Sequence, residues 1–262
     1  SLLAEQPREY TSRYVVVPVM ERYKELTGKY KRIAVVGTPC QINSLQRVKK
    51  AGMKILSIGV TCSSGTSYLA TQEYKHLMKA TDSVMYYRGN GWPGYNSLYM
   101  GEEAIEKYHT GSLFERMFSS QIFKNPGCRR CSDHFAENAD ISFCDFWNAE
   151  EMSNEKIGNS CVIVRSKCGK QIFDDMISEG VVSVVRELEK KEVIKSQYGV
   201  LKAKKGNLKK KSSYTLFIWM IDIVRKTKVF RLFGLREYQK IAATYSKLCN
   251  KSSLDFKDDY IA

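Results

Sequence analysis

The sequence has no long hydrophobic run and no secretory leader. No stretch reaches the roughly 18 apolar residues that a membrane-spanning helix requires. Residues 1–6 lack the basic start of a signal peptide, and no apolar segment follows them. We therefore expect a cytoplasmic protein with reduced cysteines. Its abrupt first residues predict a chain trimmed from something longer.

Several common signatures are also missing. The sequence contains no P-loop, no G-x-G-x-x-G fingerprint and no internal repeat. It has only three histidines, which form no Cys/His-rich knuckle. Only His134, three residues after Cys131, is a candidate ligand in a site shared with cysteines. These absences argue against a repeat protein and against a small zinc module.

Positive charge is abundant, and it is concentrated in one part of the chain. The net charge of the 262 residues is +14, and residues 186–236 hold fifteen Lys/Arg against four Asp/Glu, which is +11 of that total. We expect a core domain over residues 1–185 and a basic linker with a helical C-terminal extension over residues 186–262. Residues 200–213 are predicted to be a solvated linker. The segment carries no recognised nucleic-acid module, so nucleic-acid binding is disfavoured.

The apolar pattern of the first half predicts an α/β fold with a mostly parallel or mixed sheet flanked by helices. Strands are expected at 31–36, 53–60, 83–88, 140–145 and 160–165. Helices are expected at 15–26, from Cys40 to about 50, and at 66–79, 112–118, 169–177 and 214–235, the last as one basic amphipathic helix or two. The region 125–133 is expected to be a turn-rich loop.

Two cysteines follow the first two predicted strands directly. Cys40 lies in the turn Gly37-Thr38-Pro39-Cys40, and Cys62 lies in Thr61-Cys62-Ser63. Because the carboxyl ends of parallel strands meet at one sheet edge, where ligands bind, the two thiols are expected to lie close together. A thiol at such a turn can act as a nucleophile, as a metal or cluster ligand, or as a small buried apolar group.

A further pair of cysteines has the spacing of a metal or cluster site. Cys128 and Cys131 enclose two arginines, which would favour the thiolate form. One alternative is two unrelated loop cysteines. A thioredoxin-like pair is disfavoured, because the motif does not open a helix after a strand. Four ligands are normally needed, and Cys40 and Cys62 are the natural additions.

Iron–sulfur is preferred over zinc because the four cysteines come from three separate loops. The remaining cysteines are treated individually. We expect Cys161, Cys168 and Cys249 to be buried or incidental thiols, and the role of Cys144 stays open.

Five ordered motifs resemble the beta-subunit family of coenzyme F420-dependent hydrogenases and dehydrogenases. They are GTPCQI at 37–42, the cysteine turn at 61–65, YRGNGWPG at 87–94, CRRCSDHFAENADISFCDFWN at 128–148 and GNSCVIVRSKCGK at 158–170. The resemblance covers roughly residues 10–180. It implies an oxidoreductase with FAD and a [4Fe–4S] cluster that moves electrons to or from a deazaflavin, coenzyme F420, or another acceptor.

The resemblance also implies roles for individual residues. By position, Cys40, Cys62, Cys128 and Cys131 match the cluster ligands. Thr38, Pro39 and Gln41 match the flavin-side loop, and Arg13, Arg88 and Trp92 are expected beside the flavin or acceptor. No residue is assigned a catalytic role.

Three departures from the family pattern bear on function. Cys144 stands where relatives usually have glycine, a ferredoxin-like C-x-x-C-x-x-C segment is absent, and Ser63-Ser64-Gly65 replaces a usual His-Gly. Without that segment, electrons must enter through a redox partner protein or another route. The small-molecule electron acceptor need not be F420. The alternative is a catalytically inactive adaptor that retains the fold, linked to polysaccharide synthesis.

The basic helical region 214–235 leaves three further alternatives open. It suits peripheral contact with an anionic membrane surface or docking on a partner protein, and it equally suits packing on the protein's own core.

Overall fold

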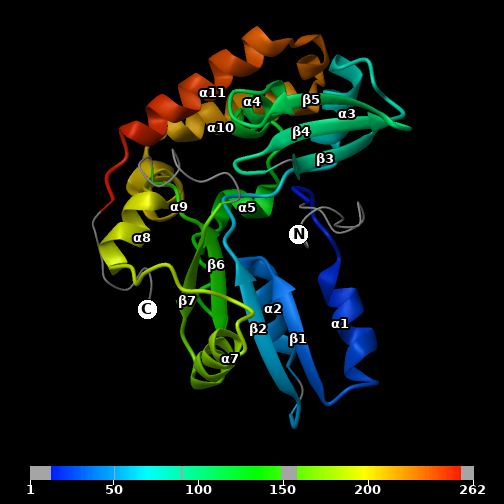
Figure 1. The fold of residues 1–262 in the computed structure, drawn as a ribbon. Helices are drawn as coiled ribbons and strands as arrows, with labels where there is room; N and C mark the ends of the chain where they lie inside the picture. Colours follow the sequence, from blue (N-terminus) through cyan, green and yellow to red (C-terminus); the bar gives the residue numbers. More distant parts are fainter. Residues whose placement is uncertain (1–12, 50, 90, 149–157, 255–262) are drawn as a thin grey trace.

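The computed structural model describes residues 13–49, 51–89, 91–148 and 158–254, and within them it contains two β-sheets. In Figure 1 the larger sheet lies in the lower half of the molecule and the smaller one at the top, with the short helix α5 between them. The strands are β1 Arg32–Gly37, β2 Lys54–Val60, β3 Val84–Gly89, β4 Tyr95–Met100, β5 Glu103–Tyr108, β6 Ile141–Asp145 and β7 Ser160–Val164.

The helices surround both sheets (Figure 1). They are α1 Val19–Thr27, α2 Pro39–Val48, α3 Leu69–Leu77, α4 Leu113–Ser119, α5 Pro126–Arg130, α7 Lys167–Ser178, α8 Lys190–Ser196, α9 Tyr198–Lys205, α10 Ser212–Lys226 and α11 Leu235–Asn250, with the 3-10 turns η2 Asn207–Lys210 and η3 Val229–Leu232. No helix of the described residues is long and apolar enough to cross a membrane.

The larger sheet has the order β1-β2-β6-β7 and is mixed, as the sequence predicts. β1, β2 and β6 are parallel, and β7 runs antiparallel to β6. The carboxyl ends of β1, β2 and β6 therefore share one edge, which carries the turns at Cys40 and Cys62 and the end of β6 at Asp145. This edge faces the smaller sheet in Figure 1.

One face of the larger sheet is covered by α1 and α2. Tyr23 of α1 and Ile42 and Leu45 of α2 are buried in a cluster with Ala136 and Ala139. Gly59 of β2 has no room for a side chain, because a Cβ there would collide with the Cβ of Ala136. Close packing therefore explains a glycine in the interior of this strand.

The smaller sheet is an antiparallel β3-β4-β5 meander. Its last two strands were not foreseen from the sequence. Met100 pairs with Glu103, so the hairpin loop is the two residues Gly101 and Glu102, and Gly101 has a φ of 64°. Glycine at the first loop position is a recognised hairpin signal, and it was available in the sequence.

The C-terminal helices share a core with the smaller sheet. Phe217 and Ile221 of α10, together with Tyr238 of α11, are buried in one cluster with Tyr74 and Phe114. The predicted domain division between residues 185 and 186 stays a prediction. Side chains from residues after 186 nevertheless complete the hydrophobic core around the smaller sheet.

The expectation of a solvated linker over residues 200–213 is wrong. The stretch lies within α9, η2 and the start of α10, and Leu201 and Leu208 are fully buried. Leu201 packs in a cluster with Phe135 of the cysteine region, and with Val193 and Ile194 of α8. The lysine-rich composition suggests a solvated linker, but burial of these leucines orders the segment as helices. The expected loop at 125–133 likewise contains the short helix α5.

Candidate functional site

The four predicted ligand cysteines occupy turns around the carboxyl edge of the larger sheet. Cys40 is the second residue of α2 and Cys62 lies two residues beyond β2, while Cys128 is in α5 and Cys131 ends it. We call these four residues the cysteine site. Cys40 is exposed and the other three are half-buried.

Hydrogen bonds connect the segments that carry the four cysteines: the Cys62 amide donates to His134 O at 3.1 Å, and Asn43 Nδ2 of α2 donates to Asp133 Oδ2 at 3.3 Å. The pKa of Cys62 is raised to about 11, mainly by burial. The charge of Lys204 lowers this pKa, and negative charge on Cys128, Cys40 and Cys131 raises it. Each of the other three sulfur atoms therefore lies within electrostatic range of Cys62. Four thiolates so placed repel one another unless a cation or a cluster compensates them.

Hydrogen-bond donors already surround the sulfur atoms. The Gly65 amide donates to Cys128 Sγ at 3.3 Å, and the Lys204 ammonium lies 3.6 Å from Cys131 Sγ. Thr38 Oγ1 lies 3.4 Å from Cys40 Sγ. Such donors lower the cost of negative charge on sulfur and tune the potential of a bound cluster.

The positive charges at the cysteine site are mainly lysines from the C-terminal helices, which sequence reasoning missed. Lys204 of α9 is buried, and its Nζ donates to Asp133 O at 2.6 Å. Lys209 of η2 donates to Cys131 O at 3.1 Å. The available signal was a lysine-rich run in a chain with four predicted thiolate ligands, whose negative charge needs nearby cations. The run was predicted to be a solvated linker instead.

Two neighbouring basic residues behave differently from this pair. Burial lowers the pKa of Lys124 to about 8, against the pull of Cys128. Arg129, one of the two arginines expected to favour the thiolates, turns to α10 and forms an ion pair with Asp222 at 2.6 Å.

His134 is a structural link in this conformation. Its Nδ1 lies 3.1 Å from Cys62 O and its Nε2 lies 3.0 Å from Gln197 Oε1. Burial lowers its pKa, so the neutral ring is favoured. A neutral ring donates to one of these two oxygens and contacts the other, and the histidine thereby joins the Cys62 turn to the start of α9.

The cysteine site fits a cluster in number, place and chemistry of its donors, although it is not preassembled. Within residues 13–49, 51–89, 91–148 and 158–254, no three His, Cys, Asp or Glu side chains stand in the arrangement of a metal-ion site. Thiolates and amide donors gathered at one sheet edge are what an iron–sulfur cluster uses. Binding a cluster would require the cysteine side chains to turn toward a common centre.

The turn that opens α2 uses most of its own donors. The Thr38 amide donates to Gln41 Oε1 at 2.9 Å, the Gln41 amide donates to Thr38 O, and Gln41 Nε2 donates to Val17 O at 3.1 Å. Pro39 has no amide proton. The turn therefore offers fewer groups to an anion than a helix start usually does, and Gln41 fastens α2 to the segment before α1.

Arg88 lies near the end of β3 and is already paired with Asp145, the last residue of β6. Its Nη1 contacts Asp145 Oδ2 at 2.7 Å, its Nε donates to Pro93 O at 2.9 Å, and its guanidinium lies 5.7 Å from the ring centre of Trp147. It also hydrogen-bonds to Tyr14, whose pKa is raised mainly by burial. Arg88 thus joins the smaller sheet to the carboxyl edge of the larger one.

Trp92 is part of the same aromatic group. Its ring centre lies 5.2 Å from that of Trp147, and its indole N–H is buried without a hydrogen-bond partner among the described residues. A buried indole donor usually has a partner, so this atom marks a place where a ligand acceptor would be stabilised. Arg13, also predicted for this region, lies close enough to lower the pKa of Tyr87, which burial raises.

The remaining cysteines lie elsewhere. Cys144 and Cys161 are directly opposite in the β6–β7 ladder, both are buried, and their thiols hydrogen-bond to each other. That bond and burial raise the pKa of Cys144. Cys168 is exposed on α7, and Cys249 hydrogen-bonds to Tyr245 on α11. Cys144 packs in the cluster of Phe135 and Leu201 rather than beside Cys62.

Comparisons with known proteins find relatives in sequence and in fold. Coenzyme F420 hydrogenase subunit beta of Methanococcus voltae is 23% identical over 212 residues, covering 76% of this chain and 67% of the relative. A chain of the F420-reducing [NiFe] hydrogenase complex from Methanosarcina barkeri shares the fold, with a TM-score of 0.53 and 18% identity. That match covers 78% of this chain and 70% of the other.

A protein-family model matches residues 30–190 of the chain. It describes the C terminus of the coenzyme F420 hydrogenase/dehydrogenase beta subunit. That range includes all four residues of the cysteine site and every strand of both sheets. The chain therefore belongs to the coenzyme F420 hydrogenase/dehydrogenase beta-subunit family.

Proposed function

We propose that this chain is an electron-transfer oxidoreductase in which Cys40, Cys62, Cys128 and Cys131 hold a [4Fe–4S] cluster. The observation that carries the proposal is that hydrogen bonds connect the segments of these four cysteines at one sheet edge, with the Gly65 amide donating to Cys128 Sγ. When bound, the cluster supplies one-electron transfer. The chain's own part is to place four sulfur ligands and to balance their charge.

The charge balance comes from three separate segments. The Gly65 amide follows the Cys62 turn, and Lys204 and Lys209 reach the Cys131 region from the C-terminal helices. A cluster held by four thiolates is anionic, so neighbouring cations and amide donors stabilise its more reduced state.

A flavin and its acceptor are the finer part of the proposal. Thr38, Pro39, Gln41, Arg13, Arg88 and Trp92 are proposed to face FAD, on the strength of the resemblance and of the unpartnered Trp92 indole. The flavin supplies hydride chemistry when bound. In this conformation Arg88 is paired with Asp145. To bind the flavin, Arg88 must either contact Asp145 and the flavin at the same time or release Asp145.

The proposed acceptor is a deazaflavin such as coenzyme F420 or another small molecule, and the proposed one-electron partner is a redox protein. Saturable quenching of flavin fluorescence on titration of the anaerobic protein with FAD would support the flavin assignment. Absence of saturable quenching with an intact cluster would remove FAD from the proposal and leave the cluster in place.

Exchange of single cysteines tests the ligand assignment. We expect Cys128→Ser to lose iron when the protein is prepared without oxygen, because a thiolate ligand contributes to the folded state with its cluster. Cys168→Ser removes an exposed thiol outside the cysteine site and should keep its iron. Full iron content in Cys128→Ser would show that the assignment is wrong. A wild-type protein without iron or flavin would favour the adaptor alternative.

A further inference from the structure

Helix α10 is apolar on both of its faces. Tyr214, Phe217 and Ile221 are buried, and the last two form part of the core shared with the smaller sheet. The outward face carries further apolar residues that do not belong to this core.

The outward face carries a continuous apolar stripe. Leu216 and Trp219 are 64% and 62% exposed, and Met220 and Ile223 are also exposed. Their spacing of i, i+3, i+4 and i+7 places all four side chains on one side of the helix. A helix that is apolar all round is normally buried all round, and a contiguous exposed apolar patch marks an interaction surface.

Exposed apolar residues continue in the sequence after the helix. Leu232 in η3 is 82% exposed, and Val229 and Leu235 on either side of it are exposed as well. We call the seven residues from Leu216 to Leu235 the α10 patch: Leu216, Trp219, Met220, Ile223, Val229, Leu232 and Leu235.

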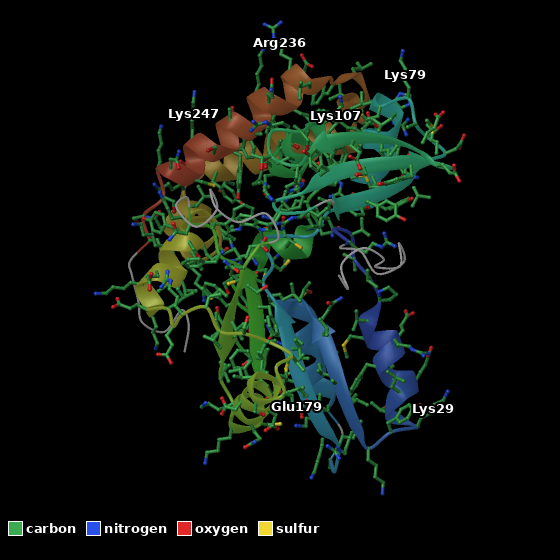
Figure 2. All side chains as sticks on the ribbon, viewed as in Figure 1. Lys29, Lys79, Lys107, Glu179, Arg236 and Lys247 are labelled. Carbon is green, nitrogen blue, oxygen red and sulfur yellow. The ribbon has the colours of Figure 1, made fainter. Side chains whose placement is uncertain are left out.

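Basic residues accompany the α10 patch, and the two acidic residues of the same region are already engaged. The exposed basic residues are Lys226, Lys228, Arg231 and Arg236. Asp222 forms its ion pair with Arg129, and Glu237 accepts the Gly234 amide at the start of α11. Arg236 points outward from the molecule at the upper end of α11 (Figure 2). The surface around the patch is therefore positively charged.

We propose that the α10 patch docks the protein on an anionic membrane surface. Exposed Trp and Leu side chains beside clustered Lys and Arg fit the boundary between lipid headgroups and acyl chains. The helix has 15 residues and spans about 22 Å, less than the roughly 30 Å of a bilayer core, so it lies along the surface. Charge complementarity selects anionic lipid over neutral lipid. The proposal does not depend on the bound cofactors.

Vesicle co-sedimentation of the whole protein tests this directly. We expect binding to vesicles of equal parts phosphatidylcholine and phosphatidylglycerol, weaker binding at high salt, and no binding to phosphatidylcholine alone. Trp219→Ser and Leu216→Ser should each weaken binding by about tenfold, since each removes a large side chain from the lipid contact. Both residues are exposed, so the variants should fold, and circular dichroism checks this.

Matched controls are available on other surfaces. Val185→Ser replaces an apolar residue outside the α10 patch that is even more exposed than Leu216 and Trp219. Lys29→Gln removes a charge at the opposite end of the molecule from Arg236 (Figure 2), and Lys228→Gln removes one beside the patch. We expect Lys228→Gln to weaken binding more than Lys29→Gln does, and Val185→Ser to have no effect.

Two results would overturn the proposal. One is a salt-independent absence of binding to both kinds of vesicle. The other is a concentration-dependent dimer in sedimentation velocity that Trp219→Ser abolishes, because a second copy would then cover the α10 patch.

Discussion

Lys204 is the residue that ties the C-terminal helices to the cysteine site. It is 6% exposed, it donates to Asp133 O at 2.6 Å, and its ammonium is the charge that opposes the effect of burial on the Cys62 pKa. A buried lysine requires such partners, because an unpaired ammonium in a protein interior is costly. Its position makes it both a structural and an electrostatic component of the site.

Replacing Lys204 by Met separates these two roles. Loss of the bond to the Asp133 carbonyl should lower the free energy of unfolding by about 1–3 kcal/mol. Loss of a cation beside an anionic cluster should also make the cluster's reduction potential more negative. Urea unfolding measures the first effect and an anaerobic redox titration measures the second.

Lys202→Met is the matched control for this prediction. It removes the same charge from the same helix, but the Lys202 ammonium bonds to Asn250 O at the C-terminal end of α11. An equal shift of potential in both variants would contradict the specific placement of Lys204.

Arg88 is the residue on which the flavin proposal depends most. We expect Arg88→Ala to weaken FAD binding by roughly 1–3 kcal/mol, about 5- to 150-fold in Kd, the scale of a lost charge-assisted hydrogen bond. Flavin fluorescence quenching measures this. Asp145→Asn keeps the guanidinium and removes its carboxylate partner, so it should not weaken FAD binding. Equal losses in both variants would show that the Arg88–Asp145 pair only supports the fold.

At the scale of elements, Asp140 fastens β2 to the start of β6. Its Oδ2 accepts hydrogen bonds from the Ser57 amide at 2.8 Å and the Ser57 hydroxyl at 2.6 Å. Burial alone would raise the pKa of Asp140, but hydrogen bonds from Ser166 and Ser57 hold it below its usual value. The carboxylate, rather than the acid, is the form that the two strands require.

This connection predicts a pH-dependent stability. A folded-state pKa below the unfolded value of about 3.9 gives stabilisation that is present above that pH and is lost as pH falls through the folded pKa. Asp140→Asn should therefore unfold at lower urea than wild type at pH 7, and the gap should narrow below about pH 4. Asp174→Asn, which breaks only an exposed pair with Lys170, should change little. A gap independent of pH would contradict this role for the Asp140 charge.

The elements also show where the sequence was informative. Apolar runs ended by turns predicted β1, β2, β6 and β7 to within a residue or two, because a short apolar run between turn residues is a strong strand signal. The β4–β5 hairpin was missed although Gly101 signals its turn. Residues 200–213 were mistaken for a linker because lysines dominate their composition, and their folding depends on tertiary burial of Leu201 and Leu208.

The cysteine site shows the same division between local and tertiary information. Cys40 and Cys62 were assigned to one sheet edge from strand order alone, and the structure places them there. Lys204, Lys209 and Gln197 could not be assigned from sequence, because they reach the site from up to about 170 residues away along the chain. Contacts of that kind depend on how the helices fold back over the sheet.

On the scale of the whole molecule, two sheets meet across the cysteine site and the Arg88–Asp145 pair. The larger sheet supplies the turns at Cys40 and Cys62, α5 supplies the other two thiols, and α9 with η2 supplies the balancing cations (Figure 1). The outer surface of α10 lies on a different part of the chain. The molecule therefore places a proposed redox centre at the carboxyl edge of the larger sheet and a proposed docking surface on the outer face of one helix.

The iron and sulfide content of the wild-type protein, purified or reconstituted without oxygen, tests the central claim most directly. Four cysteine ligands around one [4Fe–4S] cluster predict about four iron and four sulfide ions per chain, with a broad visible absorption that fades on reduction. A protein that binds neither iron nor sulfide under these conditions, or that binds a single zinc ion through the same cysteines, would contradict the account.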